Sequence, residues 1–309
     1  MSPSKKSKLA DQSVRTNKAM REISGDQNIV ERVENGGVAI QGSDNRIEII
    51  INRHASEESN PVIVEEIKPQ YFEPVTILIP AGTFLMGSPA GEGIPEYETP
   101  QHEVDLPSYR IGKYPVKNAE YEEFISQKKL LVSPVMRWDG QRAPKGRGDY
   151  PVTGVTWYEA LVYCEWLSEK TSRSYSLPNE AQWEKACRGG MDALYPWGNE
   201  FDPDRCNYGD NSRAQNEYKC FYLVGIVRQW TSTLWGEKRI APDPEFAYPW
   251  KDNRRNNLNA NRQIRRVVRG SAMKDPIHLH RCSARSGQPP EDRGLPGARY
   301  GFRVAMAVK

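Results

Sequence analysis

The sequence has few of the features on which several protein classes depend. No apolar run approaches the roughly 18 residues that a membrane-spanning helix requires. The basic start, MSPSKKSKLADQ, has no apolar stretch after its lysines and so does not fit a secretory signal. Only five of 309 residues are cysteine, with no C-x-x-C pair, which favours buried thiols in a reducing compartment over a disulfide framework. We therefore expect a cytoplasmic protein.

The chain also has little excess of basic over acidic residues and none of the common short catalytic motifs. The 43 basic and 40 acidic residues leave a net charge of +3, too small for bulk attraction to nucleic acid or an anionic membrane. No G-x-S-x-G, P-loop or dinucleotide motif occurs. The glycine-rich stretch at 87–93 precedes a proline-rich loop rather than a helix. Basic Lys251–Arg266 has no aromatic residues between its charges, so a solvated loop is favoured over a nucleic-acid contact.

The N-terminal quarter of the chain differs in composition from the remainder. Residues 1–27 are polar and predict a disordered or loosely helical tail. Residues 28–52 alternate in the way of half-buried strands and predict a β-hairpin, whose edges can add to another sheet or mediate self-association. Residues 53–74 are typical of a linker, and 75–309 form the main domain. The predicted partner-binding residues of the hairpin are Val38, Ile40, Ile47 and Ile49.

The main domain mixes strand and helix patterns, which predicts an α+β fold. Strands are expected at 75–79, 83–86 and 109–111, and a first helix at 115–127 with Asn118 as its N-cap. A second helix begins after Thr156, because Glu159 three residues later completes a capping box. A third is expected at 179–187. Two main helices with short irregular strands and long loops are therefore predicted.

Four motifs occur in order: IPAGTFLMGS, PVTGVTWYEALVYCEWL, LPNEAQWEKACRGG, and a closing RVVRGSAMKDPIHLHRCSARSGQPPEDRGLPGARYGFRVA. Together, from about Val75 to Ala305, the chain resembles the formylglycine-generating enzyme (sulfatase-modifying factor) family. The resemblance implies a variant of the C-type lectin fold. In the family's enzymes, two reactive cysteines that bind Cu(I) lie between the RGGS-type turn and the RC-A-R motif. The corresponding interval, Ala272–Arg281, has no cysteine, and Cys282 is expected to be a buried thiol.

The metal sites that the resemblance implies are also altered. One family calcium loop matches at Asn207, with Asp210 as a second candidate ligand, so a single structural calcium is the only predicted ion. In the second calcium turn, Ile226, Arg228 and Gln229 replace Asn, Trp and Glu, which argues against a metal. His278 and His280 would share one face of a strand and form a two-ligand set, but exposed polar residues on a binding face are favoured.

The resemblance therefore favours the family's non-catalytic branch, which includes the variable proteins of diversity-generating retroelements. We expect a recognition module, either a variable protein or a sensor or adaptor in a bacterial signalling or defence system. The "VAIQGSDN" hairpin resembles N-terminal segments of such proteins and would attach an effector. The alternatives are a copper-dependent oxidase, another oxidoreductase in the same cleft, and a structural subunit of a larger assembly. The predicted binding surface, exposed between buried strands at 281–285 and 301–304, comprises Trp235, Lys274, Asp275, His278, His280, Gln288, Glu291, Arg293 and Arg299.

Overall fold

The computed structural model describes the strands of the N-terminal part and residues 68–206, 216–251, 253–296 and 298–308. The chain divides into two compact units, Met1–Lys68 and Pro69–Lys309. The predicted calcium loop at Asn207 and Asp210 lies outside the described residues.

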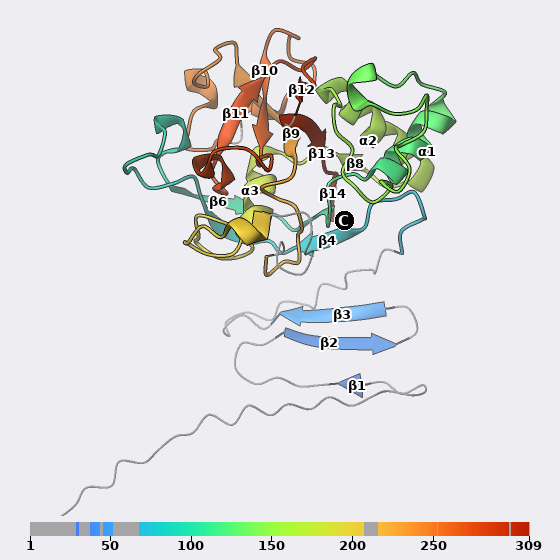
Figure 1. Cartoon of the computed structure of the whole chain (residues 1–309). Helices are drawn as coiled ribbons and strands as arrows, with labels where there is room; N and C mark the ends of the chain where they lie inside the picture. Colours follow the sequence, from blue (N-terminus) through green and yellow to red (C-terminus); the bar gives the residue numbers. More distant parts are fainter. Residues whose placement is uncertain are drawn as a thin grey trace, which may run out of the picture. The chain divides into compact units, whose positions relative to one another are not determined.

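The first unit contains a three-stranded antiparallel sheet in the order β1-β2-β3 (Figure 1). The strands are β1 (Ile29–Val30), β2 (Val38–Ser43) and β3 (Arg46–Ile51). In the β2–β3 register, Val38 pairs with Ile51 and Ile40 with Ile49. The alternating apolar pattern therefore forms the expected antiparallel pair, and β1 adds a third strand to the predicted hairpin.

Three helices of the second unit begin where local side chains satisfy their first backbone N–H groups. They are α1 (Asn118–Lys128), α2 (Trp157–Thr171) and α3 (Glu180–Arg188). The capping box of α2 is confirmed: Thr156 Oγ1 accepts from the Glu159 N–H at 3.2 Å, and Glu159 accepts from the Thr156 N–H at 2.9 Å. Asn118 as the cap of α1 was wrong, because Lys117 holds that position and Asn118 Nδ2 instead donates to the Arg147 carbonyl.

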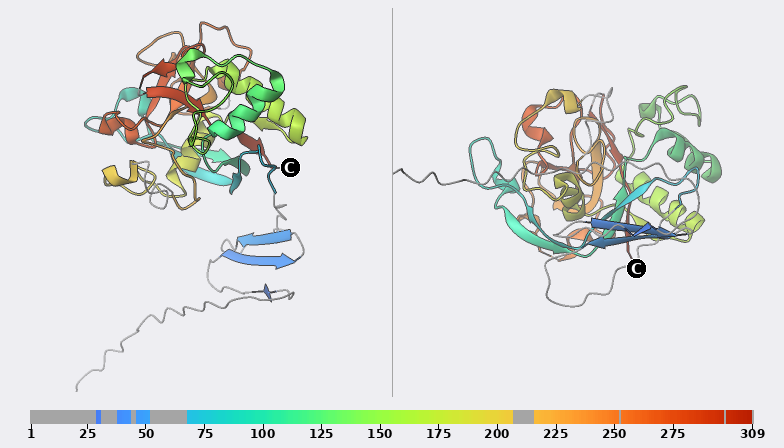
Figure 2. Two further views of the ribbon diagram at one scale, coloured as in Figure 1. Left: turned by 45° about the vertical axis from the view of Figure 1, so that its right-hand side comes forward. Right: turned by 90° about the horizontal axis from the view of Figure 1, so that it is seen from below.

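The strands of this unit form three sheets. A five-stranded sheet has the order β11-β10-β9-β13-β12, in which β13 runs parallel to β9; a four-stranded sheet has the order β4-β7-β14-β8; and β5 pairs with β6. In the views of Figures 1 and 2, α1 and α2 lie together at one side of the five-stranded sheet. The strands are β4 (Thr76–Ile79), β5 (Gly82–Met86), β6 (His102–Leu106), β7 (Tyr109–Gly112), β8 (Tyr175–Ser176), β9 (Arg228–Gly236), β10 (Arg265–Arg269), β11 (Arg285–Gln288), β12 (Gly294–Leu295), β13 (Ala298–Phe302) and β14 (Ala305–Ala307).

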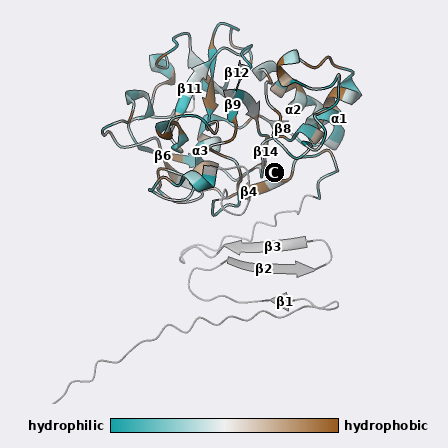
Figure 3. Ribbon diagram, in the orientation of Figure 1, coloured by the Kyte–Doolittle hydropathy of each residue, from teal (hydrophilic) through white to brown (hydrophobic). Residues whose placement is uncertain are grey.

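The core contains charged side chains as well as apolar ones, so strands and α3 carry mixed hydropathy colours in Figure 3. Glu184 of α3 is fully buried and accepts from both Arg188 and Arg269. Glu180, one turn earlier, pairs with Arg285 at 2.6 Å. Buried ions of this kind are tolerated only when they are paired and hydrogen-bonded, so the network fixes α3 against β10 and β11.

The structure corrects three expectations about the C-terminal third. Residues 281–284 are buried but form a turn, and β11 begins only at Arg285. His278 and His280 lie on the 3₁₀ turn Ile277–His280 rather than on a strand, so the expected shared face does not form. The basic segment Lys251–Arg266 is not simply solvated, because Arg255 and Arg266 are buried with their guanidinium groups over aromatic rings.

Within the described part of the chain, no helix is both long and apolar enough to cross a membrane.

Candidate functional site

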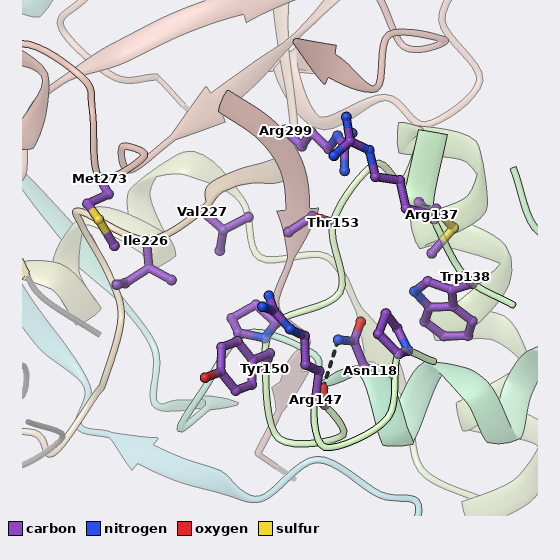
Figure 4. A pocket seen from close by; sticks show the side chains of 13 residues that line it. Asn118, Arg137, Trp138, Arg147, Tyr150, Thr153, Ile226, Val227, Met273 and Arg299 are labelled. Carbon is purple, nitrogen blue, oxygen red and sulfur yellow. Dashed lines mark hydrogen bonds between the residues drawn. The ribbon is translucent and has the colours of Figure 1, made fainter. Parts of the chain in front are cut away.

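A cavity of about 670 Å³ opens between the α1–α2 connection and the five-stranded sheet (Figure 4). Its volume falls within the range of small-molecule sites. Three arginines line it, together with aromatic, aliphatic and small polar side chains, and we call it the arginine cavity. The lining residues are Asn118, Met136, Arg137, Trp138, Pro144, Arg147, Tyr150, Pro151, Thr153, Ile226, Val227, Met273 and Arg299.

Each arginine is placed by a different element. Arg137 ends the 3₁₀ turn Pro134–Met136 in a left-handed conformation with φ of 57°. The backbone of Arg147 is held by Asn118, whose Nδ2 donates to its carbonyl at 2.9 Å, and its guanidinium lies 5.3 Å from the centre of the Tyr150 ring. Arg299 lies on β13. Figure 4 shows Arg137 and Arg299 pointing toward one another, with Trp138 beside Arg137.

The side chains that line the arginine cavity carry a net positive charge. None of the lining side chains is acidic. Burial and the positive charge of Arg137 together lower the pKa of Arg299. The Arg299 Nε is also buried without a hydrogen-bond partner. Such a site favours an anionic ligand, since guanidinium groups bind oxoanions through charge-assisted hydrogen bonds.

The segment in which the family's enzymes carry reactive cysteines borders this cavity. Met273 is half exposed and lines the arginine cavity, and the next residue, Lys274, is exposed. Asp275 is not free to bind a ligand: both of its oxygens accept from Arg228, at 2.9 and 2.7 Å, and one also accepts from the Ala272 N–H. The segment is thus a turn locked by an ion pair, with a thioether rather than a thiol at the cavity.

The cysteines whose side chains are described lie elsewhere. Cys164, Cys187, Cys220 and Cys282 are all buried, and none lines the arginine cavity. Burial raises the pKa of Cys164 and Cys187, and it raises the pKa of Cys220 to about 11. The thiolate is the reactive and metal-binding form, and burial disfavours that form in Cys164, Cys187 and Cys220. The lining of the arginine cavity therefore offers no thiol ligand and does not fit the family's copper centre.

The altered calcium turn does not fit a cation either. Gln229 is fully buried, and its Oε1 accepts from Trp183 Nε1 at 3.0 Å and Arg303 Nε at 2.6 Å. These two donors fix the amide so that Nε2 faces carbonyl oxygens of the preceding turn, with the Tyr222 oxygen at 2.9 Å. The amide N–H groups therefore occupy the oxygens that a calcium ion would need. Across the described residues, no group of three His, Cys, Asp or Glu side chains has the geometry of a metal site.

The predicted binding surface is only partly assembled. Trp235 and His280 were expected to be exposed, but they are 1% and 2% exposed. Trp235 is buried because its ring lies over Gly287, where an added Cβ would come within 2.1 Å of the indole. His280 packs against the Phe201 ring.

The other predicted residues take several roles. Arg293 forms a bidentate pair with the capping residue Glu159, at 2.6 and 2.7 Å, and Glu291 pairs with Arg262. Gln288 is half-buried on β11, while Lys274 and His278 are exposed. Among the predicted residues, only Arg299 lines the arginine cavity.

Sequence reasoning missed most of the cavity lining. The segment 132–149, for which the sequence predicted neither a helix nor a strand, supplies Arg137, Trp138 and Arg147. The arginines and the tryptophan of this segment were the available signal, but the local sequence does not indicate which of them line the cavity.

A mixed α+β scaffold with two longer helices, short strands and long loops around a ligand-sized cavity defines a C-type lectin-like fold of the formylglycine-generating type. The family of sulfatase-modifying factor enzyme 1-like domains matches residues 64–308, so the chain belongs to that family. The resemblance inferred from the motifs is thereby confirmed.

Curated relatives carry different names. Serine/threonine-protein kinase pkn1 of Chlamydia caviae is 28% identical over 282 residues, which cover 85% of this chain and 42% of that protein. The chain thus spans less than half the length of that relative. The inactive C-alpha-formylglycine-generating enzyme 2 of Mus musculus is 28% identical over 282 residues, covering 71% of this chain and 89% of that protein.

Two solved structures share the fold. PvdO from Pseudomonas aeruginosa aligns with a TM-score of 0.61 at 22% identity, over 78% of this chain and 97% of that one. Treponema denticola variable protein 1 aligns with a TM-score of 0.53 at 19% identity, over 75% of this chain and 94% of that one. At these identities the likeness concerns the fold alone.

Proposed function

We propose that this chain is a non-catalytic recognition module that binds its ligand in the arginine cavity. One observation carries the proposal. The segment that holds reactive cysteines in the family's enzymes here presents Met273 to a cavity lined by three arginines and no thiol. A cavity of this volume with a few convergent charged groups is typical of ligand binding.

The family holds both active and inactive members, so membership alone does not decide between catalysis and recognition. Oxidation of a cysteine peptide with copper needs soft thiolate ligands at the reacting site. The described thiols are buried away from the cavity, which supports recognition over the alternative of a copper-dependent oxidase or another oxidoreductase.

Two narrower forms of this function belong to the proposal. The chain is either a retroelement-diversified variable protein or a sensor or adaptor in a bacterial signalling or defence system, with β2 and β3 attaching an effector or a second copy. A diversified protein would vary at cavity positions such as Met273 and Arg299, which border its binding site. A template repeat beside the gene would select the first form, and co-purification of an effector would select the second.

The experiment that tests the absence of catalysis is direct. The purified protein is incubated with copper, oxygen and a Cys-x-Pro-x-Arg peptide, beside an active formylglycine-generating enzyme as the positive control. We expect no formylglycine product by peptide mass spectrometry. Conversion above the no-enzyme control would overturn the proposal.

A further inference from the structure

The three arginines of the arginine cavity differ from the buried arginines of the unit, because Arg137 and Arg147 are exposed and Arg299 is partly buried. Arg188, Arg269 and Arg285 each pair with a buried glutamate. In the described residues, Arg137, Arg147 and Arg299 have no carboxylate partner, although two of them face each other. Two like charges at the wall of a cavity repel one another, and a bound anion would relieve that repulsion.

The backbone at Arg137 sets the direction of its side chain, in the left-handed conformation that also ends the helices at Lys129 and Ser172. A left-handed conformation is unfavourable for a residue with a Cβ, and glycine or asparagine would adopt it more readily. From this position the Arg137 side chain points toward Arg299 (Figure 4). The guanidinium group of Arg137 therefore lies beside that of Arg299. The Arg299 guanidinium is partly buried, and its Nε has no hydrogen-bond partner.

The other residues that line the cavity indicate the chemistry of the part of the ligand that lies between its anionic groups. Arg147 and Tyr150 lie at the other end of the drawn set from the Arg137–Arg299 pair, and Ile226 and Met273 form an apolar side (Figure 4). Positive charge at both ends therefore flanks a region of apolar and aromatic contact. The cavity volume of about 670 Å³ suits a small molecule rather than a folded partner.

We infer that the arginine cavity holds a small organic polyanion, with at least two phosphoryl or carboxylate charges on a flat or apolar body. Arg137 and Arg299 together bind one anionic group of this ligand, and Arg147 binds the other. Guanidinium groups suit either oxoanion, because their planar donors bind two oxygens at once. This inference rests on the proposed recognition function and names the ligand chemistry of the same site.

The test is calorimetric titration of the full chain at constant ionic strength. The probes are adenosine diphosphate as a phosphorylated polyanion with a flat body, citrate as a polycarboxylate, acetate as a single charge, and a hexaglutamate peptide. We expect adenosine diphosphate or citrate to bind about tenfold or more tightly than acetate, and the better of the two identifies the oxoanion.

Substitutions localise the binding. Arg137→Gln and Arg299→Gln should each weaken that binding by about tenfold or more. Each substitution removes one of the two guanidinium groups that donate charge-assisted hydrogen bonds to the same anionic group. Arg142→Gln is the matched control: Arg142 is exposed in the same loop but does not line the cavity, so its loss should leave binding unchanged. Melting temperatures of all three variants verify that they are folded.

Three results would overturn the inference. These are equal binding of acetate and the polyanions, an equal loss in Arg142→Gln, and binding of hexaglutamate without binding of either small polyanion. The peptide oxidation assay tests the proposed absence of catalysis independently of the ligand chemistry. A protein that oxidised the peptide yet bound citrate through Arg137 and Arg299 would refute the absence of catalysis while leaving the ligand chemistry intact.

Discussion

Replacement of Gln229 by leucine tests whether its amide substitutes for a metal at the altered calcium turn. The side chain is fully buried and joins β9 to three other segments. Its Oε1 accepts from Trp183 and Arg303, and its Nε2 donates to the Tyr222 carbonyl at 2.9 Å. Leucine has nearly the same size and fills the space without making any of these bonds.

The expected loss of stability follows from the groups left unpaired. Each buried polar group without a partner costs about 1–3 kcal/mol, and the substitution removes the acceptor of Trp183 Nε1 and of Arg303 Nε. The Tyr222 carbonyl loses the Gln229 donor but keeps Arg303 Nη2 at 3.3 Å. Apolar burial of the leucine offsets part of this, so we expect a loss of about 3–5 kcal/mol. For a unit of this size that corresponds to a fall in Tm of roughly 6–20 °C.

Thermal unfolding followed by circular dichroism measures the effect. Gln288→Leu is the control, because Gln288 is half-buried on β11 and should change stability by no more than about 0.5 kcal/mol. Equal behaviour of the two variants would refute the reasoning.

Calcium gives a second readout on the wild-type chain. Because the amide N–H groups already satisfy the turn carbonyls, we expect no tightly held ion at this turn and fewer than two calcium ions per chain. Two such ions in elemental analysis would show that the turn still binds calcium.

Three further predictions concern other parts of the chain. Trp235→Ala should destabilise the unit by about 3–5 kcal/mol in denaturant unfolding, because the ring is buried over Gly287 and beneath Arg285; a Tm within a degree of wild type would restore its surface role. Burial opposes ionisation of Glu184, but Arg269 and Arg188 outweigh it and lower its pKa, so its stabilisation is present above the unfolded-state pKa and is lost as pH falls through the lowered value. Denaturant midpoints at pH 7 and pH 3 should therefore differ less in Glu184→Gln than in wild type, and an equal difference would contradict the assignment. Deletion of residues 1–60 should leave the second unit folded while abolishing self-association or partner capture, as measured by light scattering and pull-down with the full chain as control; aggregation of the truncated protein would place the hairpin in the core.

Features that depend on neighbours in the chain were accessible from the sequence. The capping box of Thr156 and Glu159 requires residues only three positions apart, so the start of α2 was predicted correctly. The start of α3 at Asn179 and the pairing of β2 with β3 were likewise predicted from neighbouring residues. The ordered motifs, which extend over most of the second unit, were enough to identify the family.

The sequence by itself therefore determined the local elements, the family and the absence of thiols in the cysteine interval. Only the tertiary structure decided which side chains face the cavity. The burial of Trp235 depends on Gly287 of a strand that is not adjacent in the chain, and Asp275 is locked by Arg228. Arg137 and Arg299 lie close together because a loop before α2 folds against β13, and Arg293 instead forms an ion pair with Glu159. Burial and charge pairing act between distant segments, whereas composition and spacing report only on near ones.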